Sequence, residues 1–267
     1  MIRSAEVSKL AHQEGVGARV IEKDYVLSWL LAAIAESKLR DGMAFKGGTA
    51  LKRMYYPDYR FSEDLDFTVT VDRPHEELVK TLTGLFPRLR RQVNLNLTLH
   101  RAELSVFDST TLLINYVGPL RARSGSRNLK MDFTRGELLL YPTGERPVQA
   151  PYSDYPSDVT LLTYALEEVL IEKLCALMGR TEPRDLYDVY WLFEQGEMDL
   201  LFVPANFALK SQHKGHDPER LAEAVTKKER AFGRLWTSRL AVQVQDLPPL
   251  KEVLRVVRRH LRRAGLI

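Results

Sequence analysis

The spacing of hydrophobic residues in the first part of the chain alternates between helical and strand periods. Residues 21–37 carry apolar side chains on one helical face, which predicts a helix. Residues 41–56 predict a short strand, a glycine turn and a helix. Residues 74–89 predict a further helix, and residues 93–104 and 111–118 alternate as strands do.

Two further segments alternate clearly enough to assign their faces. In residues 61–71 the apolar side chains occupy every second position, and the opposite face carries Asp64 and Asp66. Residues 127–140 predict another strand, with Asp132 on its polar face. Both strands therefore expose carboxylates on one side and bury apolar side chains on the other.

The pattern changes in the second half of the chain. Residues 141–158 are rich in proline and predict a linker or a wrapping loop. From about Leu161 onward the spacing is helical, with helices expected over residues 163–178 and 183–196 and two or three more after them. We therefore expect an α+β domain over residues 1–150 and a helical domain over residues 151–267.

Composition limits the class of protein. Of the 267 residues, 45% are hydrophobic, which is typical of a folded globular chain. The single cysteine, Cys175, excludes an internal disulfide and fits a reducing compartment. The first residues have no apolar signal-peptide core, and no apolar run is long enough to cross a bilayer. We therefore expect a soluble, cytoplasmic protein without a membrane partner.

The net charge of +4 is small, but the cations are clustered. Clusters of this kind can bind the phosphates of a nucleic acid, or they can be a mobile loop and a solvated helix face. The candidate RNA contacts are Arg121, Arg123 and Arg127 in the first cluster and Arg255, Arg258, Arg259 and Arg262 in the second.

The paired aspartates are the main candidates for chemistry. Asp64 and Asp66 share a strand face and lie about 7 Å apart along it. Neighbouring carboxylates repel each other unless a cation lies between them, and their oxygens suit Mg²⁺ or Mn²⁺. Asp132 can supply a third carboxylate, complete a two-metal site and deprotonate an attacking hydroxyl. The alternative is that all three are ordinary aspartates of exposed strand faces.

A glycine turn precedes the aspartates by about 15 residues. Gly47 and Gly48 allow the backbone to approach phosphate oxygens closely, and the helix that they open provides free N–H groups. Thr49 can cap this helix or contact phosphate. A phosphate-binding turn ahead of a carboxylate strand is what phosphoryl or nucleotidyl transfer requires.

Two charged residues fall on the apolar faces of the predicted helices. Lys173 lies within the apolar stripe of residues 163–178, and Asp185 lies on the apolar face of residues 183–196, with Asp188 at its edge. One interpretation is a buried Lys173–Asp185 ion pair that joins two helices. The other is that Lys173 contacts nucleotide phosphates and is steadied by Asp185, and the two are compatible.

These residues together resemble the AbiEii/AbiGii toxin family of nucleotidyltransferase-like proteins, the toxins of type IV toxin–antitoxin and abortive-infection systems. The resemblance covers roughly residues 21–193. It rests on I-E-K-D-Y at 21–25, F-K-G-G-T-A-L at 45–51 joined to R-F-S-E-D-L-D-F at 60–67, I-E-K-L-C-A-L at 171–177 and P-R-D-L-Y-D-V-Y at 183–190.

The resemblance implies a polymerase-β-like core with a mixed sheet, followed by a helical domain that contributes Lys173 and Asp185 to the site. Asp64 and Asp66 would hold the metal ions, and Ser62 would lie beside the phosphates, where such toxins can carry a phosphoryl or regulatory contact. The implied nucleotide-binding residues are Lys46, Gly47, Gly48, Thr49, Ser62, Lys173 and Asp188.

The family resemblance also implies an activity and partners. Its members transfer nucleotides from an NTP, in the better-understood cases to the 3′ end of tRNA, and a cognate antitoxin opposes them. The chain departs from the common pattern in two places. Thr49 replaces the more frequent serine and keeps the hydroxyl, whereas Glu182 replaces a lysine found in some members, for which Arg180 or Arg184 could substitute.

Three other functions remain open at this point. The same chemistry could modify a protein hydroxyl, since a protein and an RNA acceptor differ little in the residues that they require. A phosphotransferase would use the same phosphate-binding turn and metal. A non-catalytic nucleotide-binding module could keep the fold alone.

Overall fold

The computed structural model describes residues 1–105, 108–122 and 125–267. The chain divides into two compact units. The first unit comprises Met1–Glu137 and Thr143–Thr163, and the second comprises Leu138–Pro142 and Tyr164–Ile267. The candidate RNA contact Arg123 lies outside the described residues.

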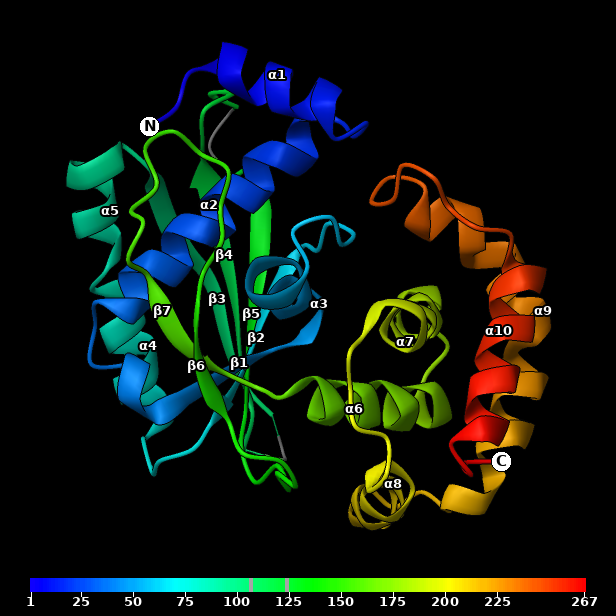
Figure 1. Cartoon of the computed structure of the whole chain (residues 1–267). Helices are drawn as coiled ribbons and strands as arrows, with labels where there is room; N and C mark the ends of the chain where they lie inside the picture. Colours follow the sequence, from blue (N-terminus) through cyan, green and yellow to red (C-terminus); the bar gives the residue numbers. More distant parts are fainter. Residues whose placement is uncertain (106–107, 123–124) are drawn as a thin grey trace. The chain divides into compact units, whose positions relative to one another are not determined.

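The first unit is built on a mixed seven-stranded sheet in the order β3-β4-β5-β2-β1-β7-β6 (Figure 1). β2 pairs in parallel with β5, and β1 pairs in parallel with β7, whereas the other neighbours are antiparallel. This confirms the expected α+β class and mixed sheet. The strands are β1 Met43–Lys46, β2 Asp64–Val69, β3 Asn96–Leu104, β4 Thr110–Val117, β5 Asn128–Thr134, β6 Gly144–Pro147 and β7 Thr160–Thr163.

The alternation predicted for β2 and β5 is confirmed. Leu65 and Phe67 on β2 and Met131 and Phe133 on β5 are fully buried, whereas the aspartates between them are partly exposed. The rings of Phe67 and Phe133 stack with their centroids 5.5 Å apart. Apolar packing on one face of the sheet thus directs the acidic side chains to the other.

Helix α2 (Ala18–Ala35) lies across one face of this sheet (Figure 1). It corresponds to the helix predicted over residues 21–37, and every residue from Asp24 to Ala35 is buried. A helix that is buried on all sides lies between other elements rather than on the surface. The other helical segments of this unit are α1 Ser4–Gln13, the 3₁₀ turn Arg40–Gly42, α3 Gly47–Ala50 with the π-helical turn Leu51–Tyr55, α4 His75–Thr83 and α5 Phe86–Val93.

The single helix predicted over residues 74–89 is wrong in detail, because two helices occupy this region. α4 ends at Thr83, and α5 begins at Phe86 with Pro87 in its first turn. Proline has no N–H with which to continue the hydrogen bonds of the preceding helix. Pro87 is tolerated only because it lies at the start of a new helix.

The linker predicted over residues 141–158 is also wrong in part. Gly144–Pro147 forms the edge strand β6, and it pairs antiparallel with Thr160–Thr163, which is β7. The helical pattern expected from Leu161 therefore begins later, at Leu166. Pro147 is accepted at the end of an edge strand, where its missing N–H breaks no interior ladder.

The second unit contains helices and no strand among its described residues. The two predicted helices are present, and α7 begins at Pro183 and ends just before Gly196 as expected. Within the described ranges, no helix is both long and apolar enough to cross a bilayer. The helical segments are α6 Leu166–Gly179, α7 Pro183–Gln195, α8 Val203–His213, the 3₁₀ turn Pro218–Arg220, α9 Leu221–Leu240 and α10 Leu250–Arg263.

Candidate active site

A row of charged residues crosses three neighbouring strands of the sheet. Asp66 on β2 lies opposite Lys46 on β1 and opposite Asp132 on β5. Residues directly opposite each other on paired strands project to the same face. The structure therefore brings Lys46, Asp66 and Asp132 together, and Asp64 lies two positions away from Asp66 on the same face of β2.

Lys130 lies among these carboxylates. It is the cross-strand neighbour of Asp64, and its Nζ donates a hydrogen bond to Asp132 Oδ2. Partial burial opposes the charged form of Lys130, but Asp132, Asp64 and Asp66 together outweigh that effect and raise the pKa of Lys130 above its ordinary value. The direction of this shift reflects the carboxylates gathered on this face.

Asp132 has defined partners for both carboxylate oxygens. Thr111 Oγ1 donates to Asp132 Oδ1 at 2.6 Å, and Lys130 donates to the other oxygen. Among the described residues, no three His, Cys, Asp or Glu side chains converge closely enough to hold a metal ion by themselves. Mg²⁺ is commonly bound by one or two carboxylates together with substrate phosphates.

The glycine turn packs directly against the carboxylate row. Gly47 has a φ of +82°, and a Cβ at this position would lie 2.5 Å from Asp66 Oδ2. A Cβ at Gly48 would lie 2.8 Å from Arg60 Nη2 and 3.3 Å from Ser62 Oγ. Gly47 therefore requires glycine for both its backbone conformation and its close contact with Asp66, whereas Gly48 is packed against the ends of two side chains. Ser62 lies next to the turn.

Thr49 has a structural contact in this arrangement. Its Oγ1 donates a 2.6 Å hydrogen bond to the main-chain oxygen of Asp64. The side chain is buried. Thr49 thus fixes the start of α3 to β2 and holds the glycine turn beside the aspartates.

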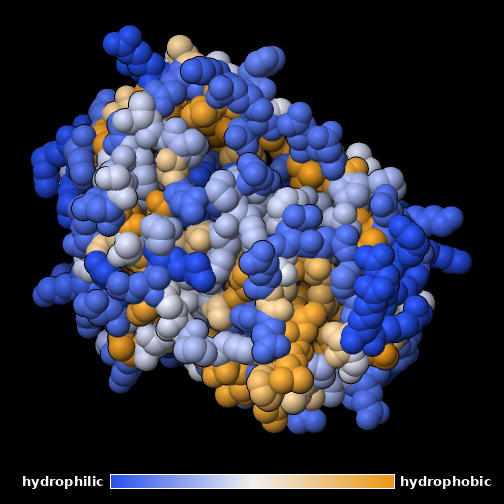
Figure 2. Space-filling view, viewed as in Figure 1, coloured by the Kyte–Doolittle hydropathy of each residue, from blue (hydrophilic) through white to orange (hydrophobic). Residues whose placement is uncertain are grey.

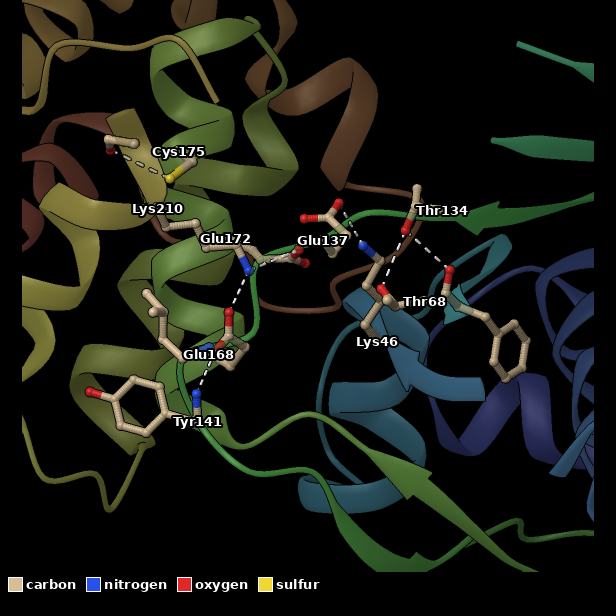
Figure 3. A network of polar contacts seen from close by, with 12 residues as sticks. Lys46, Thr68, Thr134, Glu137, Tyr141, Glu168, Glu172, Cys175 and Lys210 are labelled. Atoms are coloured by element: carbon tan, nitrogen blue, oxygen red, sulfur yellow. Dashed lines mark hydrogen bonds and ion pairs between the residues drawn. The ribbon is translucent and has the colours of Figure 1, made fainter. Parts of the chain in front are cut away.

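Two residues near the turn were not identified from the sequence. Arg60 is buried, with its guanidinium 5.3 Å from the ring centroid of Tyr59 and its Nη1 donating to the main-chain oxygen of Phe61. Arg60 precedes β2, so the alternation of apolar and polar residues that identified the strand did not include it. It does lie within the R-F-S-E-D-L-D-F motif. Glu137 pairs with Lys46 at 3.3 Å, and both side chains are largely buried (Figure 3). Glu137 was missed because an isolated charged residue after β5 belongs to no periodic pattern.

The I-E-K-D-Y motif holds the first unit together. Glu22 is fully buried, forms an ion pair with Arg127, and accepts a 2.7 Å hydrogen bond from the Leu120 amide. Asp24 is also buried and pairs with Arg53, which follows α3. These contacts connect α2 to the segments that position the glycine turn and β5.

The arginines of the first basic cluster therefore differ in their exposure to solvent. Arg127 is mostly buried against Glu22, and desolvation lowers its pKa. Arg121 lies in a turn with a φ of +51° and exposes its side chain. Of the candidate RNA contacts that the structure describes in this cluster, only Arg121 is exposed to solvent.

In the second unit, Lys173 forms ion pairs with two buried aspartates. Its Nζ lies 3.0 Å from Asp185 Oδ1 and 2.7 Å from Asp188 Oδ2. Arg180 donates two further hydrogen bonds to Asp185, at 2.7 and 3.0 Å. Burial raises the pKa of Asp185, but Lys173 and Arg180 outweigh it and lower that pKa below its usual value. The predicted Lys173–Asp185 pair between α6 and α7 is present.

A second ionic network lies deeper in this unit. Lys210 on α8 is fully buried and pairs with Glu168 and Glu172 on α6 (Figure 3). Glu168 also accepts hydrogen bonds from the amides of Leu140 and Tyr141, at 2.8 and 2.9 Å. These contacts attach the segment Leu138–Pro142 to α6.

The C-terminal basic cluster lies on α10. Arg258 pairs with Glu229 on α9 at 3.0 Å, and Arg259 pairs with Glu194 on α7 at 2.9 Å. Arg255 and Arg262 are exposed. The helix buries its apolar residues on the opposite side, so the arginines lie on its outer surface.

Comparison with known proteins places the chain in a family. The model of the family described as "Nucleotidyl transferase AbiEii toxin, Type IV TA system" matches residues 29–258. No protein of curated function matches the chain by sequence.

Solved structures share the fold at low sequence identity. MenT4, a nucleotidyltransferase toxin from Mycobacterium tuberculosis, has 19% identity and a TM-score of 0.74, and the match covers 97% of this chain and 88% of MenT4. JHP933 from Helicobacter pylori has 17% identity and a TM-score of 0.57, with 93% of each chain covered. The family match extends over most of the chain, and the mixed sheet agrees with it. The chain belongs to the AbiEii family of nucleotidyltransferase toxins of type IV toxin–antitoxin systems.

Proposed function

We propose that this nucleotidyltransferase transfers a nucleotide from an NTP to the 3′ end of RNA, with tRNA as the acceptor, and thereby blocks translation and growth. The observation that carries the proposal is the row Lys46–Asp66–Asp132, with Asp64 beside it, packed against the turn at Gly47 and Gly48. A cognate antitoxin would oppose this activity, as the type IV family suggests.

The glycine turn is the proposed site for the NTP phosphates. Gly47 and Gly48 have no Cβ, so phosphate oxygens can approach the main-chain N–H groups of the turn. Arg60 lies beside Gly48 and offers a guanidinium to the same phosphates. Ser62 would donate its hydroxyl there.

Asp64 and Asp66 are the proposed ligands of Mg²⁺ or Mn²⁺. They provide hard carboxylate oxygens on one strand face, next to Lys130, whose pKa these carboxylates raise. When bound, the metal ion would neutralise charge on the phosphates of the NTP. Lys46, held by Glu137, would keep Asp66 in place from the neighbouring strand.

Asp132 is the proposed general base. The 3′-hydroxyl of the acceptor attacks the α-phosphorus of the NTP, its proton passes to Asp132, the bond from oxygen to phosphorus forms, and pyrophosphate leaves with the electrons of the broken bond. The hydrogen bonds from Thr111 and Lys130 orient the carboxylate for this step.

Lys173 is proposed as an additional cation for the nucleotide, with Asp185 and Asp188 as its supports. Two ion pairs hold its amine in a defined position. A lysine that only joined two helices would have no effect on nucleotide affinity once stability was restored. This difference separates the structural role from the functional one.

The identity of the acceptor is tested by following the label. Purified protein is incubated with Mg²⁺, total tRNA and each α-labelled NTP in turn, and RNA and protein are separated. The proposal predicts label on the RNA 3′ end. Label on protein would move the acceptor to a polypeptide hydroxyl, and transfer from γ-labelled but not α-labelled NTP would establish a phosphotransferase. An NTP that binds without any transfer would indicate a binding module.

A further inference from the structure

Helix α10 carries a straight stripe of cations along one face. Lys251, Arg255, Arg258 and Arg262 follow one another at intervals of four, three and four residues. This spacing keeps the side chains on one side of a helix. The stripe extends over about 16 Å, because eleven residues rise by about 1.5 Å each.

The stripe lines an open groove within the second unit. The groove has a volume of about 720 Å³, and Glu229 of α9 forms part of its wall. Strongly hydrophilic side chains cover the surface over α10 (Figure 2). The lining residues are Glu229, Pro249, Lys251, Glu252, Leu254, Arg255, Arg258 and Arg262.

Most of the stripe has no protein partner. Arg258 pairs with Glu229, but in the described part of the chain Lys251, Arg255 and Arg262 have no hydrogen bond or ion pair, and all three are exposed. On the neighbouring face of the same helix, Arg259 and His260 both contact Glu194. The protein therefore neutralises one side of α10 and leaves the groove side cationic.

The chemistry of the groove favours a phosphodiester backbone as its occupant. Four of the eight residues that line the groove are basic, and Leu254, which also lines it, is only 2% exposed. A flat bilayer surface does not fit a concave groove. Regularly spaced, solvated arginines and lysines are the usual contacts for the phosphates of a nucleic acid, and they act without reading its sequence.

We propose that the α10 groove binds the phosphodiester backbone of the RNA acceptor, through Lys251, Arg255 and Arg262 and with Arg258 held in register by Glu229. The proposal rests on the proposed function for the identity of the acceptor as RNA. It assigns RNA affinity to a surface that takes no part in the chemistry at Asp64, Asp66 and Asp132.

The test measures binding separately from catalysis. The affinity for fluorescently labelled total tRNA is determined by anisotropy in EDTA and without NTP, at several salt concentrations. The triple variant Lys251→Ala/Arg255→Ala/Arg262→Ala is compared with a control that also loses three exposed cations, Arg3→Ala/Lys9→Ala/Arg91→Ala. Thermal unfolding verifies that both are folded.

We expect the α10 variant to lose roughly 100-fold in affinity at 0.1 M salt, and its log–log salt slope to fall by about 2 to 3, since each lost phosphate contact removes about 0.7 to 0.9 of slope. The control should stay within about threefold of the original protein, because scattered surface cations lie outside the groove. An affinity and a slope like those of the control would overturn the proposal. Unchanged tRNA affinity combined with lost binding of an acidic partner protein would also overturn it.

The binding test and the nucleotide-transfer assay can fail separately. If α10-dependent binding is found but no nucleotide is transferred, the groove assignment stands and the function fails. If transfer occurs and the α10 variant binds normally, the function stands and the groove assignment fails.

Discussion

At the scale of single residues, the glycine turn is the most constrained point of the site. Gly47 combines a left-handed backbone with contact against Asp66, and Gly48 is packed against Arg60 and Ser62. The G-G-T sequence indicated a phosphate-binding turn, but it did not show why the turn needs glycine. Glycine is needed because side chains of β2 and of the segment before it pack against the turn. Strand pairing determines where these side chains lie along the turn.

Substitution of Gly47 tests this constraint. Gly47→Ala should lower the free energy of unfolding by about 1–3 kcal/mol and abolish nucleotide transfer, because the new Cβ needs a strained backbone and displaces Asp66. Gly144→Ala serves as the control, since a Cβ there meets nothing within 4 Å. Urea unfolding and label transfer are measured together. Normal transfer by Gly47→Ala would show that Asp66 tolerates displacement.

Arg60 leads to a separate prediction. Arg60→Lys keeps the charge but loses the planar guanidinium beside Gly48, so the KM for NTP should rise roughly tenfold while kcat changes less. The remote exchange Arg3→Lys should leave the KM unchanged. A folded Arg60→Lys variant with an unchanged KM would restrict Arg60 to packing against Tyr59.

At the scale of secondary structure elements, periodicity predicted those parts whose burial is one-sided. β2, β5 and α7 each follow their apolar pattern, whereas α2 was predicted although it is buried on all sides. The four-residue strands β6 and β7 are too short to show a period, and β7 was assigned to a helical region. Their conformation depends on pairing with each other and with β1, which is information that local sequence does not contain.

The helix pair α6–α7 gives a prediction at this scale. Lys173→Met should destabilise the protein by about 3–5 kcal/mol, because Asp185 and Asp188 lose a shared cation while they stay buried. Lys173→Met/Asp188→Asn should recover part of that loss, because one buried charge is removed. Chemical denaturation measures both.

The same variants separate the two roles of Lys173. A stable double variant with a lower affinity for NTP than the original protein would support a phosphate contact by Lys173. A stable double variant with normal NTP affinity would leave Lys173 as an ion pair between helices. A loss of less than about 1 kcal/mol in Lys173→Met would contradict the buried-pair account itself.

At the scale of the whole molecule, the sequence predicted the residues of the site better than it predicted the residues that hold them in place. Asp64, Asp66 and Asp132 were predicted as a group, and strand register brings Asp66 and Asp132 opposite each other. Glu137 and Arg60 were missed, because isolated charges carry no periodic signal. Glu22 and Asp24 were recognised only as a motif, and the structure gives them partners in Arg127 and Arg53.

The basic residues illustrate why charge alone was ambiguous. Arg127 forms an ion pair with the buried Glu22, whereas Lys251, Arg255 and Arg262 are exposed along one groove. Both clusters look alike in sequence. Their different roles depend on which acidic residues the fold places beside them.

The most direct test of the account is the rate of nucleotide transfer in Asp66→Asn. This substitution keeps the size of the side chain and removes its charge, and Asp72→Asn provides a control on an exposed acid just beyond the same strand. With tRNA and α-labelled NTP in Mg²⁺, we expect a loss of about 100-fold or more for Asp66→Asn, no loss for Asp72→Asn, and no transfer by the original protein in EDTA. Equal rates in folded Asp66→Asn and Asp72→Asn would contradict the assignment of chemistry to this strand.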